Sequence, residues 1–335
     1  MPVKVAINGF GRIGRLAFRQ MFEDATFEIV AINDLTDAES LAYLLEYDSA
    51  QGRYRHGEIS FTESAVHVAG KEVKIYAEKD PENLPWKSLG IDVVVECTGF
   101  FTDEASASKH IKAGARKVVI SAPAKGNIKT IVYNVNHTTL TKDDVVISGA
   151  SCTTNCLAPM IKVLDDNFGV KLGYMTTVHA YTNDQATLDV AHPKGIHTRR
   201  GRAAAANIVP TTTGAAVAVG EVLPHLKGKL DGIALRVPTI TGSAVDLVVE
   251  LNQDTDVKGL NAVFEKNVSE TLGYTTMPIV SSDTIGMTYG SLVDAAMTSM
   301  IDTGDRKLFK ILSWYDNEMS YVAQMVRTTK YFGSL

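Results

Sequence analysis

The sequence predicts an α/β protein. Its N-terminal half is expected to be a Rossmann-type, doubly wound parallel sheet, and its C-terminal half an α+β domain with a large, mostly antiparallel sheet. Two patterns support this. Up to about residue 150, short runs rich in Val and Ile alternate with helical patterns, as in a parallel sheet that helices cover on both faces. After about residue 170, apolar and polar residues alternate with a period close to two, which is typical of a sheet with one exposed face.

Length and composition set the outer limits of the interpretation. A chain of 335 residues exceeds the size at which one core keeps growing, so we expect two domains. The first is a nucleotide-binding domain over residues 1–151, completed by a C-terminal helix at 317–335, and the second is a catalytic domain over residues 152–316. A net charge of -5 argues against a dedicated nucleic-acid binder, which needs a surplus of Lys and Arg.

Cysteine content and hydropathy bear on the compartment. Three cysteines do not make a disulfide framework, which fits a reducing environment. No apolar stretch approaches the roughly 20 residues that a membrane span requires. The chain runs from Met1 straight into a strand without a signal peptide. We therefore expect a cytoplasmic protein that neither enters nor spans a membrane.

The first domain begins with a strand and a glycine-rich turn. We expect its buried strands at Val3–Asn8, Ile29–Asp34, Val93–Glu96, Val118–Ser121 and Val145–Ile147. The turn, Gly9-Phe10-Gly11-Arg12-Ile13-Gly14, follows the first strand and opens a helix. G-x-G-x-x-G alone is a weak signal, and a turn needed only for packing is the alternative. With a strand before it, a helix after it and Asp34 twenty residues beyond Gly14, the pattern favours dinucleotide binding.

The same turn suggests which dinucleotide binds. Glycines let the backbone approach a pyrophosphate closely, and the helix N-terminus stabilises the negative charge of that group. Asp34 can accept hydrogen bonds from ribose hydroxyls and would repel a 2′-phosphate. The sequence therefore favours NAD over NADP.

The chemistry is expected at Cys152. The run Ser151-Cys152-Thr153-Thr154-Asn155-Cys156 lies where a strand gives way to a helix, so the thiol falls in the first turn of that helix. Free N–H groups and the helix dipole favour an anion there, and we expect the pKa of this thiol to be lowered. Cys97 and Cys156 are expected to be packing residues. No metal site is predicted, because C-x3-C lacks two further ligands.

A histidine and several arginines are candidate partners of this thiol. His179 ends an apolar strand and is followed by polar residues, so it could activate Cys152, although an ordinary buried histidine is equally compatible. The basic run of Arg199, Arg200 and Arg202 is either a solvated loop or an anion site, with the hydroxyls of 211–214 nearby in sequence. Arg236 lies in an apolar strand, where an anionic ligand would serve as its partner.

The rest of the second domain shows three further elements. A strand with alternating exposure is expected at Ala244–Leu251, because its apolar residues recur at every second position. An amphipathic helix that would cover the sheet is expected from the spacing of Leu260, Val263, Phe264 and Val268. A final helix carries Tyr321, Val322, Met325 and Val326 on one stripe, and we expect it to pack on the first domain.

Three motifs in order identify a family resemblance: Ala6 to Arg15, Ser148 to Cys156, and Trp314 to Glu318. With them, the chain resembles the phosphorylating, bacterial-type glyceraldehyde-3-phosphate dehydrogenases over nearly its whole length. The resemblance implies a homotetrameric, NAD-dependent enzyme of glycolysis in the cytoplasm, with glyceraldehyde 3-phosphate and inorganic phosphate as its other partners. It implies that Cys152 is the nucleophile and His179 the base.

The resemblance also assigns binding residues. The substrate phosphate and inorganic phosphate would be held by Ser151, Thr153, Thr182, Arg200, Thr213, Gly214 and Arg236. NAD would contact Gly9, Gly11, Arg12, Ile13, Gly14, Asp34, Lys79, Ser121 and Asn317, with Asn317 on the nicotinamide carboxamide. The stretch from Asp189 to Thr198 departs from the family's usual pattern, which bears on the exclusion of NADP and on the choice among the three neighbouring arginines.

Other functions stay open at this point. Erythrose-4-phosphate dehydrogenase or an NADP-linked biosynthetic relative would share the motifs. Surface or RNA binding as a secondary role is the alternative from a different class.

Overall fold

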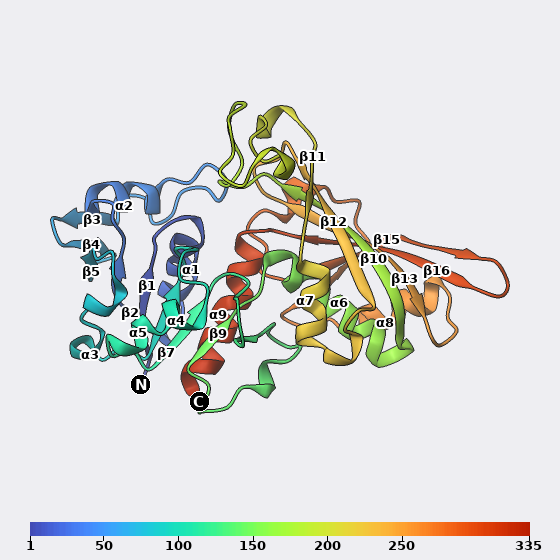
Figure 1. The fold of residues 1–335 in the computed structure, drawn as a ribbon, viewed down its shortest axis with the longest axis horizontal. Coiled ribbons are helices and arrows are strands. Elements are labelled where there is room, and N and C mark those ends of the chain that lie inside the picture. Colours follow the sequence, from blue (N-terminus) through green and yellow to red (C-terminus); the bar gives the residue numbers. More distant parts are fainter. The chain divides into compact units, whose positions relative to one another are not determined.

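The computed structural model describes residues 1–335, which divide into two compact units. Unit 1 comprises Met1–Ala150 and Met325–Leu335, and unit 2 comprises Ser151–Gln324. Each unit is built around its own sheet (Figure 1). None of the helices combines the length and the apolar character that a membrane span needs.

Unit 1 contains a nine-stranded sheet in the order β3-β4-β5-β2-β1-β6-β7-β9-β8. From β5 to β8 all neighbours in this order are parallel, whereas β3, β4 and β5 form an antiparallel edge. The strands are β1 (Val3–Asn8), β2 (Phe27–Asn33), β3 (Ile59–Thr62), β4 (Ala65–Val68), β5 (Lys71–Tyr76), β6 (Val93–Glu96), β7 (Lys117–Ile120), β8 (Lys129–Thr130) and β9 (Val146–Ser148).

The Rossmann-type fold class predicted for this half is confirmed, and each of the five predicted strands lies within two residues of its expected bounds. The three edge strands between residues 59 and 76, together with β8, were not predicted. None of them is a long apolar run: β3 is almost wholly exposed, β5 has one buried residue, and β4 is buried but only four residues long. Strands of this kind carry a weak apolar signal.

The helices of unit 1 are α1 (Arg12–Phe22), α2 (Ala38–Glu46), α3 (Trp86–Leu89), α4 (Glu104–Ala107) and α5 (Lys109–Lys112), with short 3-10 turns η1 (Pro81–Asn83) and η2 (His137–Thr139). Helix α1 buries Leu16, Ala17, Phe18 and Met21. Gly14 allows this helix to approach β1 closely, because a Cβ atom there would lie 2.1 Å from the Gly9 carbonyl oxygen.

Unit 2 contains a seven-stranded sheet in the order β11-β12-β10-β13-β16-β15-β14. Four of its pairings are antiparallel and two, β10 with β12 and β14 with β15, are parallel, which confirms a mostly antiparallel sheet. The strands are β10 (Val170–Ala180), β11 (Val209–Thr212), β12 (Leu230–Val237), β13 (Ser243–Leu251), β14 (Leu272–Thr275), β15 (Ser291–Asp302) and β16 (Lys307–Tyr315).

Three helices, α6 (Cys152–Phe168), α7 (Ala215–Val222) and α8 (Val257–Lys266), lie along one face of this sheet (Figure 1). The short turns are η3 (Ile196–Thr198), η4 (Ala204–Ala206), η5 (Pro224–Leu226) and η6 (Ser281–Thr284). On β10, Leu172, Tyr174 and Val178 are exposed, and the positions between them, from Gly173 to Thr177, alternate between buried and more exposed. The expected sheet with one exposed face is therefore present.

The two helices predicted near the C-terminus are both found, with one correction. Helix α8 buries Leu260 and Phe264 but ends at Lys266, so the prediction that Val268 continues its stripe is wrong. The chain leaves the helix at Asn267, whose N–H donates back to the Val263 and Phe264 carbonyls. Helix α9 (Met319–Ser334) buries all four predicted stripe residues, and its residues from Met325 onward belong to unit 1.

Candidate active site

Cys152 is the first residue of α6. Ser151 caps this helix, because its Oγ accepts a hydrogen bond of 3.1 Å from the Thr154 N–H. The residue before the cap, Ala150, has φ +60°, in the left-handed region, so the backbone makes a tight and strained turn into the helix. The thiol is thereby fixed at the end of the helix where N–H groups are free.

The structure brings Cys152 and His179 together. The distance from Cys152 Sγ to His179 Nε2 is 3.3 Å. His179 lies near the end of β10, which is paired on one side with β12 and on the other with β13, and its side chain is buried. A strand held on both sides is a rigid support, so the imidazole has little freedom to move away from the sulfur.

The prediction that the pKa of the Cys152 thiol is lowered is wrong. Although Cys152 retains some exposed surface, burial raises the pKa of its thiol, and the Arg236 charge and hydrogen bonds from Thr153 offset this only in part. Burial, followed by the charge of Arg236, lowers the pKa of His179 to about 3. Desolvation therefore outweighs the helix N-terminus, and neither group taken alone is charged at neutral pH.

Arg236 begins a chain of polar contacts that leads away from the histidine. Its Nη1 lies 2.9 Å from His179 Nδ1 and donates to the Ala180 carbonyl at 3.1 Å and to Thr182 Oγ1 at 3.1 Å. Thr182 in turn donates to Asp184 at 2.5 Å, and Asp184 pairs with Arg200. Two predicted anion-binding arginines are thus joined through three consecutive contacts.

The three neighbouring arginines differ in their surroundings. Arg200 is half-buried, and its pKa is lowered by burial and by the charge of Arg236. Arg202 is exposed and pairs with Asp189, while Arg199 donates to the Pro210 carbonyl at 3.3 Å. The charge of Arg200 contributes to lowering the pKa of His179, and the charge of Arg236 lowers the pKa of Arg200, so Arg200 lies close to both groups.

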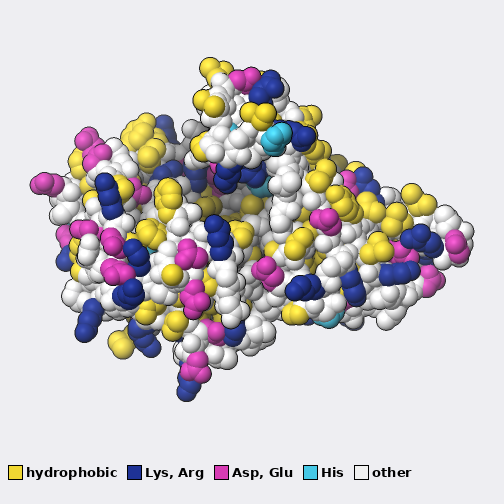
Figure 2. All heavy atoms as spheres, in the orientation of Figure 1, with side chains coloured by type: hydrophobic (Ala, Val, Ile, Leu, Met, Phe, Trp, Pro, Cys, Tyr) yellow, Lys and Arg dark blue, Asp and Glu magenta, His cyan; other side chains and the backbone are white.

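A cavity of about 460 Å³ lies beside this loop, lined among others by Lys194, His197, Arg199, Arg200 and Thr212. Figure 2 shows Lys, Arg and His side chains gathered on the loop that precedes β11. The cavity does not include Cys152 or His179. Thr213 and Gly214 directly follow Thr212, which lines the cavity. Thr213 Oγ1 accepts a hydrogen bond from the Ala215 N–H at 3.2 Å. Gly214 is the N-cap of α7, and a Cβ atom there would meet nothing within 4 Å.

Further buried residues contact the residues around Cys152 and His179. The buried hydroxyl of Tyr315 lies 2.9 Å from Thr153 Oγ1 and 2.8 Å from Thr177 Oγ1, and its ring is edge-on to His179. Ser243 Oγ accepts from the Ala180 N–H at 3.0 Å and donates to Asn317 Oδ1 at 2.9 Å.

Asn317 Oδ1 receives an additional hydrogen bond from the Gly242 N–H at 3.2 Å, and Thr241 Oγ1, which donates to Asp316 at 2.8 Å, lies 3.3 Å away. With two donors on its oxygen, the amide of Asn317 is fixed in orientation. Its NH₂ group is left as the donor for a ligand.

In unit 1, the three motif glycines serve different purposes. Gly9 has φ +89°, and a Cβ atom there would lie 2.7 Å from the Thr98 nitrogen. Gly14 permits the close helix packing described above. At Gly11 a Cβ atom would meet nothing within 4 Å, so open space lies in front of the N-terminus of α1. An anion of the size of a pyrophosphate fits the chemistry of this position, since free N–H groups point into it.

The other predicted cofactor contacts surround the carboxyl ends of the parallel strands. Asp34 follows β2 and accepts from the Phe10 N–H at 2.7 Å, which ties it to the glycine turn. Arg12 pairs with Asp48, and Ile13 beside it is half-buried. Lys79 is exposed in the loop after β5, and Ser121 follows β7. These positions lie at the edge of the sheet where dinucleotides bind in doubly wound folds.

Comparison with known proteins decides the family. The model of the glyceraldehyde 3-phosphate dehydrogenase NAD binding domain matches residues 3–104, and that of the C-terminal domain of the same enzyme matches residues 151–317. A glyceraldehyde-3-phosphate dehydrogenase of Clostridium pasteurianum is 58% identical over 332 residues, covering 99% of both chains. The chain belongs to the glyceraldehyde-3-phosphate dehydrogenase family.

Other family members are similar over the same length. A glyceraldehyde-3-phosphate dehydrogenase of Clostridium acetobutylicum is also 58% identical over 332 residues. That of Streptococcus pyogenes serotype M1 is 53% identical over 336 residues, covering 100% of this chain and 99% of that protein. The resemblance inferred from three short motifs is thereby confirmed as family membership.

Sequence reasoning missed several residues that the structure places at these sites. Asp184, Tyr315, Ser243 and the polar residues that end β1, β2 and β6 were not singled out. A signal was available for the last group, since Asn8, Asn33 and Glu96 are polar residues at the ends of apolar runs.

Proposed function

We propose that this protein catalyses the NAD-dependent, phosphorylating oxidation of D-glyceraldehyde 3-phosphate to 1,3-bisphosphoglycerate in glycolysis. The observation that carries the proposal is the 3.3 Å contact between Cys152 Sγ and His179 Nε2, with Arg236 against the same imidazole. This joins an activated nucleophile to a cationic group that recognises a phosphate. The names of the similar proteins agree with that activity.

The reaction begins on sulfur. His179 Nδ1 lies 2.7 Å from the Ala180 carbonyl oxygen. When Nδ1 carries the ring proton and donates it to this oxygen, Nε2 has a lone pair that faces the thiol. Nε2 accepts the thiol proton as Cys152 attacks the aldehyde carbon, and the imidazolium returns this proton to the developing alkoxide, which gives a thiohemiacetal with neutral His179 beside it. His179 then takes the hydroxyl proton, and two electrons and a proton leave the same carbon as hydride. The product on Cys152 is a thioester.

The thioester is resolved by inorganic phosphate. A phosphate oxygen attacks the acyl carbon, the carbon–sulfur bond breaks, and Cys152 leaves as thiolate while 1,3-bisphosphoglycerate forms. A thioester retains the energy of oxidation that a simple hydrolysis would lose. The residues proposed to hold the two phosphates are those named from the resemblance: Ser151, Thr153, Thr182, Arg200, Thr213, Gly214 and Arg236.

The substrate phosphate has a second effect in this arrangement. The charge of Arg236 contributes to lowering the pKa of His179. A phosphate that pairs with Arg236 offsets this charge, so the base becomes stronger when the substrate is in place. Arg200 supplies the second positive charge, and its contact with Asp184 must yield when the anion binds.

NAD is the proposed cofactor, and it supplies the hydride acceptor when bound. The open space at Gly11, the N-terminus of α1 and the Asp34 carboxylate are the features of this chain that fit it. Asp34 would hold the ribose hydroxyls, Lys79 and Ser121 would line the site, and the NH₂ of Asn317 would bind the carboxamide. We assign the nucleotide-binding role to unit 1 and the catalytic role to unit 2.

We further propose a homotetramer that acts in the cytoplasm. The face of the unit 2 sheet opposite its helices exposes large apolar side chains, including Leu172, Tyr174 and Ile233. A second copy of this chain is the proposed occupant, because the family resemblance implies four copies. Three free cysteines suit a reducing compartment. Light scattering on the purified protein gives the number of copies directly, and a monomer would contradict the proposal.

The activity is tested by absorbance of NADH. The purified protein is mixed with glyceraldehyde 3-phosphate and NAD, with and without inorganic phosphate. We expect continuous NADH formation only when phosphate is present, and a single turnover or less without it. The alternative activities are tested with erythrose 4-phosphate in place of glyceraldehyde 3-phosphate and with NADP in place of NAD. A higher kcat/KM with either replacement would overturn the assignment.

A further inference from the structure

A buried polar network lies beneath the proposed nucleotide site of unit 1. Its centre is Glu96, the last residue of β6, whose side chain is fully buried. Asn8 ends β1 and Asn33 ends β2, and the strand register aligns Asn8 with both Asn33 and Glu96. Three adjacent parallel strands therefore end in a row of polar side chains, and Asn8 and Asn33 each stand just before a segment proposed to contact NAD.

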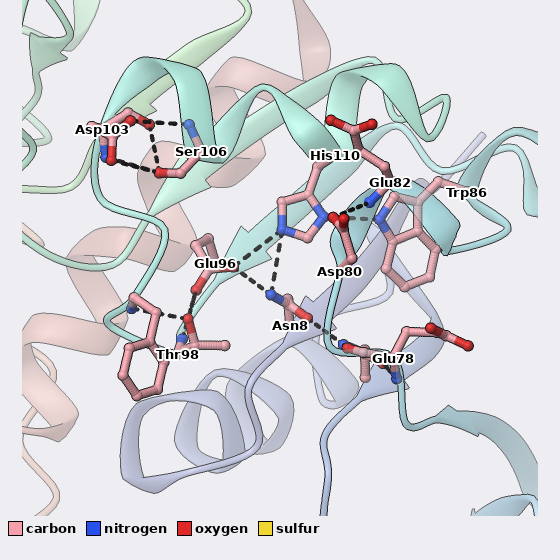
Figure 3. Close-up of polar contacts among 12 residues, drawn as sticks. Asn8, Glu78, Asp80, Glu82, Trp86, Glu96, Thr98, Asp103, Ser106 and His110 are labelled. Carbon is pink, nitrogen blue, oxygen red and sulfur yellow. Dashed lines mark hydrogen bonds and ion pairs between the residues drawn. The ribbon is translucent and has the colours of Figure 1, made fainter.

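Four donors surround the carboxylate of Glu96. Asn8 Nδ2 donates to Oε2 at 2.5 Å, and His110 Nε2 lies 3.1 Å from the same oxygen. The Thr98 N–H donates to Oε1 at 2.7 Å, and the Thr98 hydroxyl donates to Oε1 as well. Figure 3 shows these contacts converging on one side chain. A carboxylate that only accepts matches four donors, whereas a protonated acid or an amide would not.

The tautomer of His110 is fixed from the far side. The indole Nε1–H of Trp86 donates to His110 Nδ1 at 3.0 Å. An indole can only donate, so Nδ1 must be the acceptor and the ring proton is on Nε2, where it points at Glu96. No Lys or Arg pairs with Glu96, so the buried charge is held by hydrogen bonds alone.

The network continues toward Lys79. Asn33 Nδ2 donates to Asn8 Oδ1 at 2.7 Å and to the Glu78 carbonyl at 3.0 Å. The Glu78 N–H donates to Asn33 Oδ1 at 2.8 Å. The loop after β5, the turn after β1 and the loop after β6 are thus tied to one another through side chains.

From this arrangement we infer that Glu96 is a positioning residue for the dinucleotide. Its carboxylate binds both Asn8, where the glycine turn begins, and Thr98 in the loop after β6, so it fixes these two segments relative to each other. Through Asn8 and Asn33 it also fixes the backbone next to Asp34 and Lys79. Preformed binding segments lose less entropy when the ligand binds. The inference rests on the proposed function, since it concerns NAD at the same site.

The test is calorimetric titration of the full-length protein with NAD, together with steady-state kinetics. In Glu96→Gln the new NH₂ group faces donors, so one buried donor loses its acceptor, and we expect the Kd and KM for NAD to rise about tenfold or more. We expect kcat at saturating NAD to stay within twofold of the wild type. If the role of Glu96 were purely structural, the substitution would instead lower the fraction of protein that is active, and the KM for NAD of that active fraction would not change.

The matched control is Glu250→Gln, the same substitution at another buried glutamate. Glu250 lies in β13 of unit 2 and pairs with Lys171 and Arg306. We expect its NAD Kd to stay within twofold of the wild type. Equal Kd values for Glu96→Gln and wild type would overturn the inference, as would equal increases in both variants.

If Glu96→Gln does not fold, Thr98→Val removes one donor and serves instead. A rise of its NAD Kd would support the inference, and an unchanged Kd would overturn it. A wild-type protein that does not bind NAD at all would contradict the proposed function, which is a different and separable result.

Discussion

The coupling of Cys152 to His179 gives the most informative single perturbation, His179→Asn. Taken alone, the thiol has a raised pKa and the imidazole a lowered one, so neither is charged at pH 7. A thiolate and an imidazolium 3.3 Å apart attract by about 5 kcal/mol at an effective dielectric constant of about 20. This attraction offsets part of the cost of burying the two charges, so the thiolate forms more readily with the imidazole in place than without it.

The substitution removes the proton acceptor and leaves an isolated thiol. Even with an ordinary pKa of about 8.5, only about 3% of such a thiol is ionised at pH 7, and burial lowers that fraction further. We expect the rate of Cys152 alkylation by iodoacetamide at pH 7 to fall by about tenfold or more. The folded pKa of the thiol is raised, so the rate should recover as the pH increases through and beyond 8.5.

Peptide mass spectrometry after timed quenching measures this rate for each cysteine separately. Cys97 is an internal control, because burial raises the pKa of its thiol to about 12 and its surroundings in unit 1 do not include His179. An unchanged melting temperature shows that the variant is folded. A Cys152 rate within twofold of the wild type at pH 7 would refute the coupling.

The remaining predictions concern single residues. Cys152→Ser should keep the melting temperature but lose almost all turnover, because an ester is less reactive than a thioester; normal activity would remove Cys152 from its role. Asp34→Ala should raise kcat/KM with NADP relative to NAD, and an unchanged ratio would show that Asp34 does not select the cofactor. Arg200→Gln should raise the KM for the phosphorylated substrate or for phosphate about tenfold, whereas the exposed Arg202→Gln should change either by less than twofold. Equal effects of the two arginine variants would contradict the choice of Arg200.

Much of the fold could be predicted because its signals are local. Five strands of unit 1 are short runs rich in Val and Ile, and the glycine turn lies between a strand and a helix within one short stretch. The edge strands from 59 to 76 were not predicted because β3 and β5 are largely exposed and the buried β4 is only four residues long. Val268 was misplaced because a helical spacing does not reveal where the chain turns, and it turns at Asn267.

The site was only partly predictable because its properties arise from distant residues. The prediction that Cys152 has a lowered pKa considered the helix start alone. The structure adds the burial of the sulfur and the neighbourhood of Arg236, which lies 84 positions further along the chain. Glu96 likewise acquires its role from Asn8 and His110, which come from separate elements. No spacing rule within one segment could reveal these contacts.

The central claim is that the sulfur of Cys152 carries the acyl group between oxidation and release. The most direct test is to mix the protein with NAD and glyceraldehyde 3-phosphate in the absence of inorganic phosphate, quench with acid and map the adduct by peptide mass spectrometry. We expect one 3-phosphoglyceroyl group per chain on the peptide that contains Cys152, and its disappearance when phosphate is added before the quench. NADH formation without any adduct on that peptide, or an adduct on another residue, would contradict the account.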